Sequence, residues 1–223
     1  MSMDLIPIKK THVTFYNQFE LYHMPKEGEP LLYKKADQTL DREMLDRNQY
    51  PQFYIRKEDE AQVVKDLQKV LNSRLVKAIS NKGLAVVREI VGMIVEEALQ
   101  GPIDISLAAL PETIEILLMG ARKNTGLLES LLSIQENNRA VVEHSINVLA
   151  LTAQYAISVG LPEDRVKKLC LAALVHDVGH TLISKELFEA KDRLSDEEFQ
   201  QFQTHSLKGY RAILKYPEFG KSV

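Results

Sequence analysis

Three ionisable side chains fall within five residues, at His176, Asp177 and His180, near the end of an apolar helical run. Burying a charge or an unpaired imidazole in such a run is costly unless another group compensates it. A bound metal ion is one of the few groups that can do so, because imidazole nitrogens and carboxylate oxygens are common metal ligands. The segment 176–180 is therefore a candidate metal site.

Two further histidines have a spacing that suits such a site. His144 lies 32 residues before His176, and His205 lies 29 residues after it. A hydrolytic metal site takes ligands from several elements and leaves positions open for water and substrate. On a helix, His176 and Asp177 would point about 100° apart, so one can bind a single ion while the other bridges two. Taken alone, each histidine is also compatible with an ordinary buried core residue.

Two predicted helices would carry most of these side chains. The first covers 137–159 and is apolar on two faces, which is typical of a buried helix, so we expect the imidazole of His144 to point into protein. The second begins at Pro162 after Gly160, a residue that favours a helix stop, and we expect Gly179 to end or loosen it. Its inward side is predicted to contain Val166, Leu169, Cys170 and Ala173.

A third predicted helix would carry the last candidate ligand. Ser195 and Glu198 have the spacing of a capping box, in which each side chain bonds to the main chain of the other residue. The helix that follows presents Phe199, Phe202 and then His205. We expect it, like the other two, to be buried.

The same residues belong to a longer pattern. It contains His144-Ser145 with Val148, Ala172-Ala173-Leu174-Val175-His176-Asp177-Val178-Gly179, Ile183-Ser184, Leu194 before Glu197-Glu198, and His205 with Gly209, Ile213 and Leu214. Over roughly 137–214, this pattern resembles the HD superfamily of metal-dependent phosphohydrolases, and within it the HD-GYP branch.

The resemblance implies a fold, an activity and a set of site residues. The expected fold is a mainly α, HD-type helical bundle, and the expected reaction is hydrolysis of cyclic di-GMP or a related phosphoester at a dinuclear centre. Two divalent metal ions, iron or manganese, are the implied cofactors. The positions that match the family's ligands are His144, His176, Asp177 and His205, of which His176 and Asp177 are also the predicted catalytic residues.

Three departures from the family pattern modify this expectation. The family's lysine, which approaches the substrate phosphate, is replaced by His180, which we predict to bind substrate instead. Ala140 stands where trinuclear members carry a glutamate, which argues against a third ion. The family's paired histidines, its GYP loop and its final aspartate are expected beyond Val223, so this chain is expected to carry part of the site. Gly209-Tyr210-Arg211 is interpreted as helix packing and not as the GYP loop.

Two alternatives to an enzyme remain open at this level. The full-length parent is expected to be a phosphodiesterase, but the replacement at position 180 and the missing family elements are also compatible with a catalytically degenerate protein. Such a protein would sense a nucleotide or bind partners of a signalling pathway. The remaining alternative is a purely structural helical bundle with buried histidines.

The first part of the chain has a different character. Eight aromatic residues fall within the first 54 residues, and the next is Tyr155. Segments 12–22, 31–34 and 52–56 have the composition of β-strands, and a helix is predicted over about 57–71. We therefore predict a small β-containing partner or regulatory module at 1–74, followed at 75–223 by a helical connector and the incomplete HD-GYP-like domain. Connectors of this kind often pair, so a homodimer is a further possibility.

Composition excludes several classes of function. The chain of 223 residues is 45% hydrophobic and 26% charged, as in ordinary globular proteins, and its net charge of −3 offers no basic surface for a nucleic-acid polymer. No signal peptide or membrane span is evident, so a cytoplasmic protein is expected. Cys170 is the one cysteine, which rules out an internal disulfide, and its apolar neighbours predict a buried, unreactive thiol.

Overall fold

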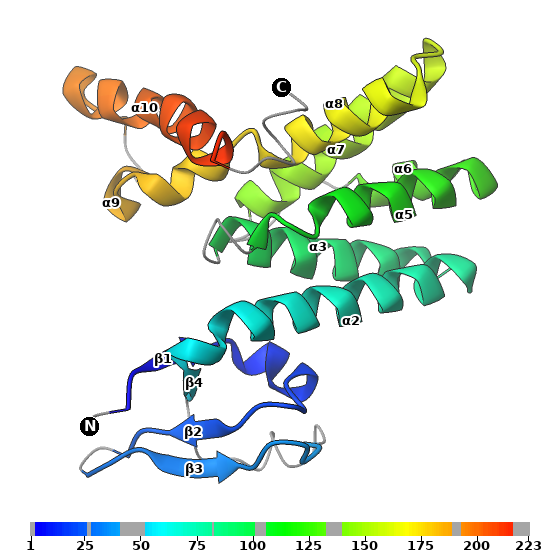
Figure 1. Ribbon diagram of the computed structural model, residues 1–223. Helices are drawn as coiled ribbons and strands as arrows, with labels where there is room; N and C mark the ends of the chain where they lie inside the picture. Colours follow the sequence, from blue (N-terminus) through cyan, green and yellow to red (C-terminus); the bar gives the residue numbers. More distant parts are fainter. Residues whose placement is uncertain are drawn as a thin grey trace. The chain divides into compact units, whose positions relative to one another are not determined.

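The computed structural model describes residues 3–25, 28–40, 52–81, 83–100, 106–132, 140–188 and 193–215. The chain divides into two compact units, 1–70 and 71–223, and the division falls within one long helix, α2 (Glu60–Ser80). The predicted class, a mainly helical protein with a small β-containing N-terminal module, is confirmed (Figure 1).

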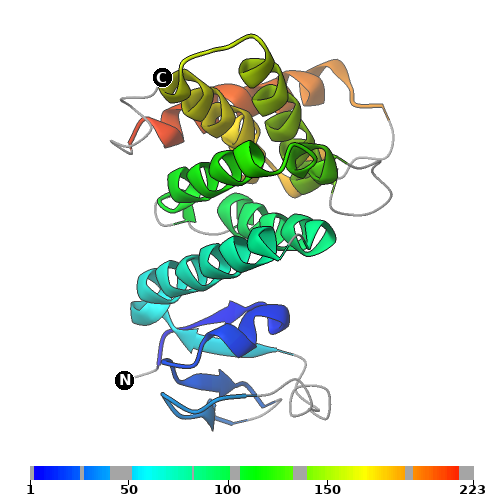
Figure 2. The same cartoon turned by 90° about the vertical axis from the view of Figure 1, so that its right-hand side faces the viewer.

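The N-terminal unit is built on a four-stranded antiparallel sheet of order β1-β4-β2-β3 (Figure 2). Its strands are β1 (Leu5–Ile8), β2 (Leu21–His23), β3 (Leu31–Lys34) and β4 (Phe53–Arg56). Two 3₁₀ helices, η1 (Lys10–Phe15) and η2 (Lys57–Asp59), precede β2 and α2 respectively.

The predicted strand over 12–22 is largely wrong. Residues 10–15 form η1, and Val13 and Tyr16 are both buried, a spacing of three that a 3₁₀ turn brings onto one side. Only 21–23 are extended. Strand β1 was not predicted, and Pro7 lies within it. The strand is at the edge of the sheet, where a residue without an N–H is tolerated.

One charged side chain lies in the core of this unit. Lys34 is only 1% exposed, and its Nζ donates to the carbonyl oxygens of Asn17, Phe19 and Lys35 at 2.9, 2.7 and 2.8 Å. Burial lowers the pKa of this amine, but each of its three hydrogens has an acceptor. The lysine therefore joins β3 to the segment between η1 and β2.

The second unit is helical. Besides the end of α2, it contains α3 (Leu84–Gln100), α5 (Leu110–Lys123), α6 (Leu127–Leu131), α7 (Ala140–Ser158), α8 (Glu163–Val175), η3 (Val178–Leu182), α9 (Lys185–Phe188) and α10 (Asp196–Ile213). α7 and α8 pack along each other, and α3, α5 and α6 contact this pair. α10 packs on η3 and, more lightly, on α9 (Figure 1).

Most helix starts agree with the sequence. Pro111 lies in the first turn of α5, and Pro162 is the N-cap of α8, with acidic residues in the turn that follows. The capping box is present: the Ser195 hydroxyl accepts from the amide of Glu198 at 3.3 Å, and the Glu198 carboxylate accepts from the amide of Ser195 at 2.8 Å. The helix predicted to end near residue 71 was too short, because α2 continues to Ser80.

The expectation that all three ligand-bearing helices are buried was wrong in part. On α7, the first predicted stripe is in the core except at its end, where Ile157 is 47% exposed; its buried members are Val142, Ile146, Leu149 and Ala153. On the second predicted stripe, Leu151 and Tyr155 are 55% and 68% exposed. Leu169 of α8 is 42% exposed, whereas Cys170 is buried as predicted. On α7 and α8, the apolar residues therefore extend beyond the side of each helix that neighbouring described helices cover.

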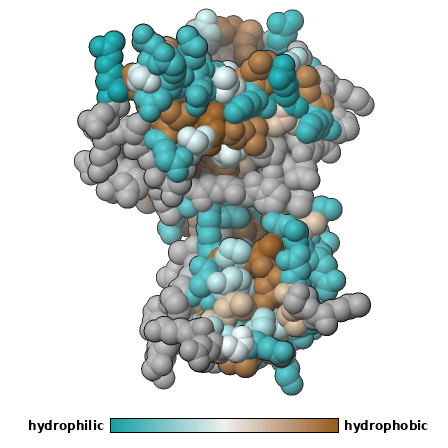
Figure 3. Space-filling view, turned by 90° about the vertical axis from the view of Figure 1, so that its left-hand side faces the viewer, coloured by the Kyte–Doolittle hydropathy of each residue, from teal (hydrophilic) through white to brown (hydrophobic). Residues whose placement is uncertain are grey.

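α10 is the most exposed of the three. Gly209 and Ile213 are its buried residues, and Phe199 is 51% exposed. Figure 3, viewed from the side on which α9 and α10 lie in Figure 1, shows apolar side chains of the helical unit among hydrophilic ones. No helix within the described segments has the length and apolar character needed to cross a membrane.

Candidate metal centre

The candidate ligands come together from α7, the end of α8, η3 and α10 of the helical unit. His144 lies in the second turn of α7, and His176 and Asp177 follow directly after the last residue of α8. His180 lies in η3, and His205 is on α10. The packing of α7 on α8, and of η3 on α10, brings these side chains to a common point. The other three ligands predicted from the sequence, His144, His176 and His205, are therefore close to Asp177.

The first group of ligand atoms faces one oxygen of the Asp177 carboxylate. His176 Nε2 lies 3.1 Å and His144 Nε2 lies 3.7 Å from Asp177 Oδ2. The two imidazole Nε2 atoms are 3.2 Å apart. Each residue of this group thus offers one donor atom to a shared space, and all three atoms lie within 4.8 Å of one another.

A second group faces the other oxygen of the same carboxylate. His180 Nε2 is 3.5 Å and His205 Nε2 is 3.6 Å from Asp177 Oδ1. The rings of His180 and His205 are stacked, with centroids 3.9 Å apart and an interplanar angle of 16°. These three ligand atoms also lie within 4.8 Å of one another. Asp177 therefore lies between two groups that could each hold an ion.

Main-chain carbonyls orient two of the imidazoles. The Nδ1 atom of His176 donates to the carbonyl oxygen of Ala173 at 2.7 Å, and that of His205 donates to the carbonyl oxygen of Phe202 at 2.7 Å. Because a carbonyl oxygen can only accept, the proton in each bond is on Nδ1. The Nε2 atom that faces Asp177 can then present its lone pair, which is the arrangement usual for a histidine ligand.

The charges of the site reinforce one another. Burial raises the pKa of the Asp177 carboxyl, but hydrogen bonds from His176 and His180, with their charges, outweigh burial and hold that pKa well below its usual range. The hydrogen bond to Asp177 raises the pKa of His176, against the opposing effect of burial. Asp177 therefore stays a carboxylate, and a proton on His176 occupies a place for which a divalent cation would compete.

His144 is the predicted ligand whose position differs most from expectation. The sequence predicted that its imidazole points into protein, but 47% of its side chain is exposed. It lies on the partly uncovered side of α7, together with Leu151 and Tyr155. The Asp177 side chain is more protected, at 17% exposure. The first group of ligands is therefore open to solvent on the side of His144.

The role predicted for Gly179 was also wrong. α8 ends at Val175, before this glycine is reached, and Gly179 lies within η3. A Cβ added to Gly179 would overlap the carbonyl oxygen of His205 and lie 2.7 Å from the amide nitrogen of Gly209. The pair of glycines lets η3 and α10 approach at backbone contact. This confirms that Gly209 serves in helix packing.

His180 is the residue whose surroundings the sequence did not reveal. It was predicted to contact substrate phosphate, yet its Nε2 lies beside Asp177 Oδ1 and only 10% of its side chain is exposed. The spacing of three residues between Asp177 and His180 was the available signal, because residues three apart lie on the same side of a helical turn.

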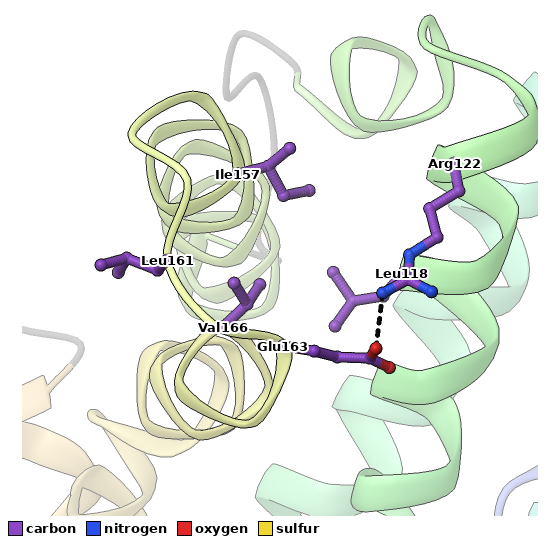
Figure 4. Close-up of a pocket in the computed structure, with 6 residues that line it drawn as sticks. All are labelled: Leu118, Arg122, Ile157, Leu161, Glu163 and Val166. Carbon is purple, nitrogen blue, oxygen red and sulfur yellow. Dashed lines mark ion pairs between the residues drawn. The ribbon is translucent and has the colours of Figure 1, made fainter.

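A pocket of about 170 Å³ lies elsewhere in this unit (Figure 4). It is formed by α5, the end of α7 and the start of α8, and the Arg122 guanidinium pairs with the Glu163 carboxylate at 2.7 Å on its wall. The remaining lining residues are apolar: Leu118, Ile157, Leu161 and Val166. None of the predicted ligands lines this pocket.

Comparison with known proteins supports the resemblance. Residues 141–222 match the family model described as the HD domain. This chain is 28% identical to the cyclic di-GMP phosphodiesterase PA4108 of Pseudomonas aeruginosa over 92 residues, which are 41% of the chain. It is 29% identical to the cyclic di-GMP phosphodiesterase PdeB of Borreliella burgdorferi over 68 residues, which are 30% of the chain. The alignments span only about a fifth of these relatives, 22% and 18% of their lengths.

The fold also has a solved counterpart. Bd1817, an HDG"Y"P protein from Bdellovibrio bacteriovorus, matches with a TM-score of 0.58 over 99% of this chain and 74% of its own, at 19% sequence identity. At that identity the likeness concerns the fold. Residues 141–222 are therefore identified as an HD domain, and the names of the relatives and of this structural neighbour are consistent with the HD-GYP branch.

Proposed function

We propose that this chain is part of a metal-dependent phosphodiesterase that hydrolyses cyclic di-GMP or a related phosphoester. The observation that carries the proposal is the convergence of His144, His176 and Asp177 on one space, inside the region that matches the HD domain. The names of the two curated relatives support cyclic di-GMP as the substrate.

The imidazole and carboxylate donor set suits two divalent metal ions, and the resemblance to the HD-GYP branch favours iron or manganese. His144 and His176 would hold one ion with Asp177 Oδ2, and His205 would contribute to the other with Asp177 Oδ1. When bound, such ions supply Lewis-acid polarisation of a phosphodiester and lower the pKa of water.

The chain's own residues prepare this chemistry. Asp177 remains ionised and presents one oxygen to each group of histidines. The carbonyl of Ala173 fixes the ring of His176, so its Nε2 is directed to the site without a change of rotamer. The exposed side of the first group, at His144, is where a phosphoester would enter.

The remaining parts of the chain have proposed roles as well. Residues 1–74 would act as a partner or regulatory module, and 75–223 as the helical connector with the catalytic part. Protein partners of a signalling pathway and a second copy of the chain are the proposed binding partners, with the cytoplasm as the proposed location.

The test is hydrolysis of cyclic di-GMP by the full chain loaded with Fe²⁺ or Mn²⁺ under anaerobic conditions, followed by chromatography of the linear product. Asp177→Asn should abolish turnover. Asp164→Asn is the matched control, because it makes the same change at an exposed carboxylate in the first turn of α8, and it should leave turnover unchanged. Turnover by Asp177→Asn at the wild-type rate would refute the proposal.

A second candidate function is favoured by His180, which replaces the lysine that the family uses near phosphate. In that case the chain binds a cyclic nucleotide as a sensor without hydrolysing it. Calorimetric titration of the metal-loaded chain with cyclic di-GMP separates the two functions. Binding with release of a linear product supports the phosphodiesterase, and binding with full recovery of the cyclic nucleotide supports the sensor.

A further inference from the structure

We propose that His180 is a metal ligand, and that Asp177 Oδ1, His180 Nε2 and His205 Nε2 form the second cation position of the site. This inference rests on the proposed function, because it assigns a residue to the second of the two ions. It changes the role of His180 from contact with substrate phosphate to coordination of metal.

The distances fit the edges of a coordination polyhedron. Metal–ligand bonds of about 2.1 Å place two ligand atoms about 3.0 Å apart at a right angle and about 3.4 Å apart at the tetrahedral angle. The Nε2 atoms of His180 and His205 lie 3.5 and 3.6 Å from Asp177 Oδ1. These separations are longer than the usual N–H···O hydrogen bond, yet they lie within a few tenths of an ångström of the tetrahedral edge.

The environment of His180 does not suit a phosphate contact. Only 10% of its side chain is exposed, and its ring lies between His205 and Phe202, whose centroids are 3.9 and 5.2 Å away. Its Nε2 faces a carboxylate oxygen, which repels an anionic phosphate. A cation at the same point would be attracted by Asp177 and accepted by both imidazoles.

Local structure explains why a histidine can reach this position. Asp177 and His180 are three residues apart across the start of η3, and a 3₁₀ turn brings residues three apart onto the same side. The close contact of Gly179 with α10 then brings His205 beside them. A lysine at position 180 would carry a permanent positive charge at neutral pH and could not donate a lone pair to metal.

The experiment is a count of bound Mn²⁺ by equilibrium dialysis of the full chain, with electron paramagnetic resonance to detect coupling between the ions. The wild type should bind two ions per chain that are magnetically coupled through Asp177. His180→Ala and His180→Lys should each bind one ion, with the uncoupled spectrum of isolated Mn²⁺. The ion that remains shows that α7 and α8 are still folded in these variants.

His144→Ala is the matched control, since it removes one histidine from the first group and should also leave one uncoupled ion. Two coupled ions in His180→Ala, with weakened binding of cyclic di-GMP, would overturn the inference in favour of the phosphate contact and leave the proposed function intact. Two coupled ions in the wild type and one in His180→Ala, without turnover of cyclic di-GMP, would support the inference while refuting the proposed function.

Discussion

Because η3 and α10 are in backbone contact at Gly179, we expect a larger residue at this position to destabilise the helical unit. Adding one methyl group, in Gly179→Ala, places a carbon over the carbonyl oxygen of His205 and 2.7 Å from the amide nitrogen of Gly209. Ordinary van der Waals contact with that nitrogen begins at about 3.4 Å, so the two elements must separate by more than about 0.7 Å. Both obstacles are backbone atoms, which cannot rotate away as a side chain can.

The expected cost is at the upper end of the range for overpacking, about 3 kcal/mol. For a unit of this size, that corresponds to a fall in unfolding temperature of roughly 6–12 °C. Because the separation also carries His205 away from Asp177, the second cation position should be lost with it. Urea unfolding followed by circular dichroism gives the first quantity, and Mn²⁺ dialysis gives the second.

Gly92→Ala is the control for this prediction. Gly92 is buried in α3, but a Cβ built on it meets nothing within 4 Å. The same substitution there should raise the free energy of unfolding by about 0.5–1 kcal/mol, since alanine is the better helix former. If Gly179→Ala matched the wild type in both stability and metal content, the close approach of η3 and α10 would be refuted.

Three further predictions concern the core, the thiol and the metal. Lys34→Met leaves three main-chain carbonyls without their donor and should destabilise the N-terminal unit by about 2–4 kcal/mol in urea unfolding. Its control is Lys57→Met, at a side chain that is 62% exposed, which should cost less than about 1 kcal/mol. Equal losses of stability in the two variants would contradict a structural role for the Lys34 hydrogen bonds. Burial raises the pKa of the Cys170 thiol to about 11, which lowers the fraction of reactive thiolate at neutral pH. A thiol reagent near neutral pH should therefore label Cys170 only as the protein unfolds. Immediate labelling of the native chain would show that the thiol is accessible. Addition of a chelator should lower the unfolding temperature of the metal-loaded wild type and leave that of Asp177→Asn unchanged, and an equal fall in both would place the stabilising ion elsewhere.

Much of the helical unit could be predicted from the sequence because its signals are local. Pro111, Pro162 and Ser195 each act within one turn of the helix that they begin, so their effect does not depend on distant residues. The spacing of the histidines and Asp177 was also informative, because it matches a family pattern in which the ligands are brought together by the fold.

The features that were missed depend on contacts between elements. Pro7 obscured β1, whose place at the sheet edge is set by pairing with β4. The exposed side of α7, with His144 and Tyr155, could not be identified from periodicity alone, because a hydrophobic stripe does not say whether a neighbour covers it. The proximity of His180 to His205 likewise follows from the packing of η3 on α10.

Asp177 is proposed to organise a metal centre with a histidine group at each of its two carboxylate oxygens. Anomalous diffraction from crystals of the full chain grown with Mn²⁺ would locate the bound ions relative to this carboxylate. We expect two anomalous peaks, one within bonding distance of His144, His176 and Asp177 Oδ2, and the other within bonding distance of His205 and Asp177 Oδ1. Saturating Mn²⁺ with no peak at either oxygen of Asp177 would contradict this proposal.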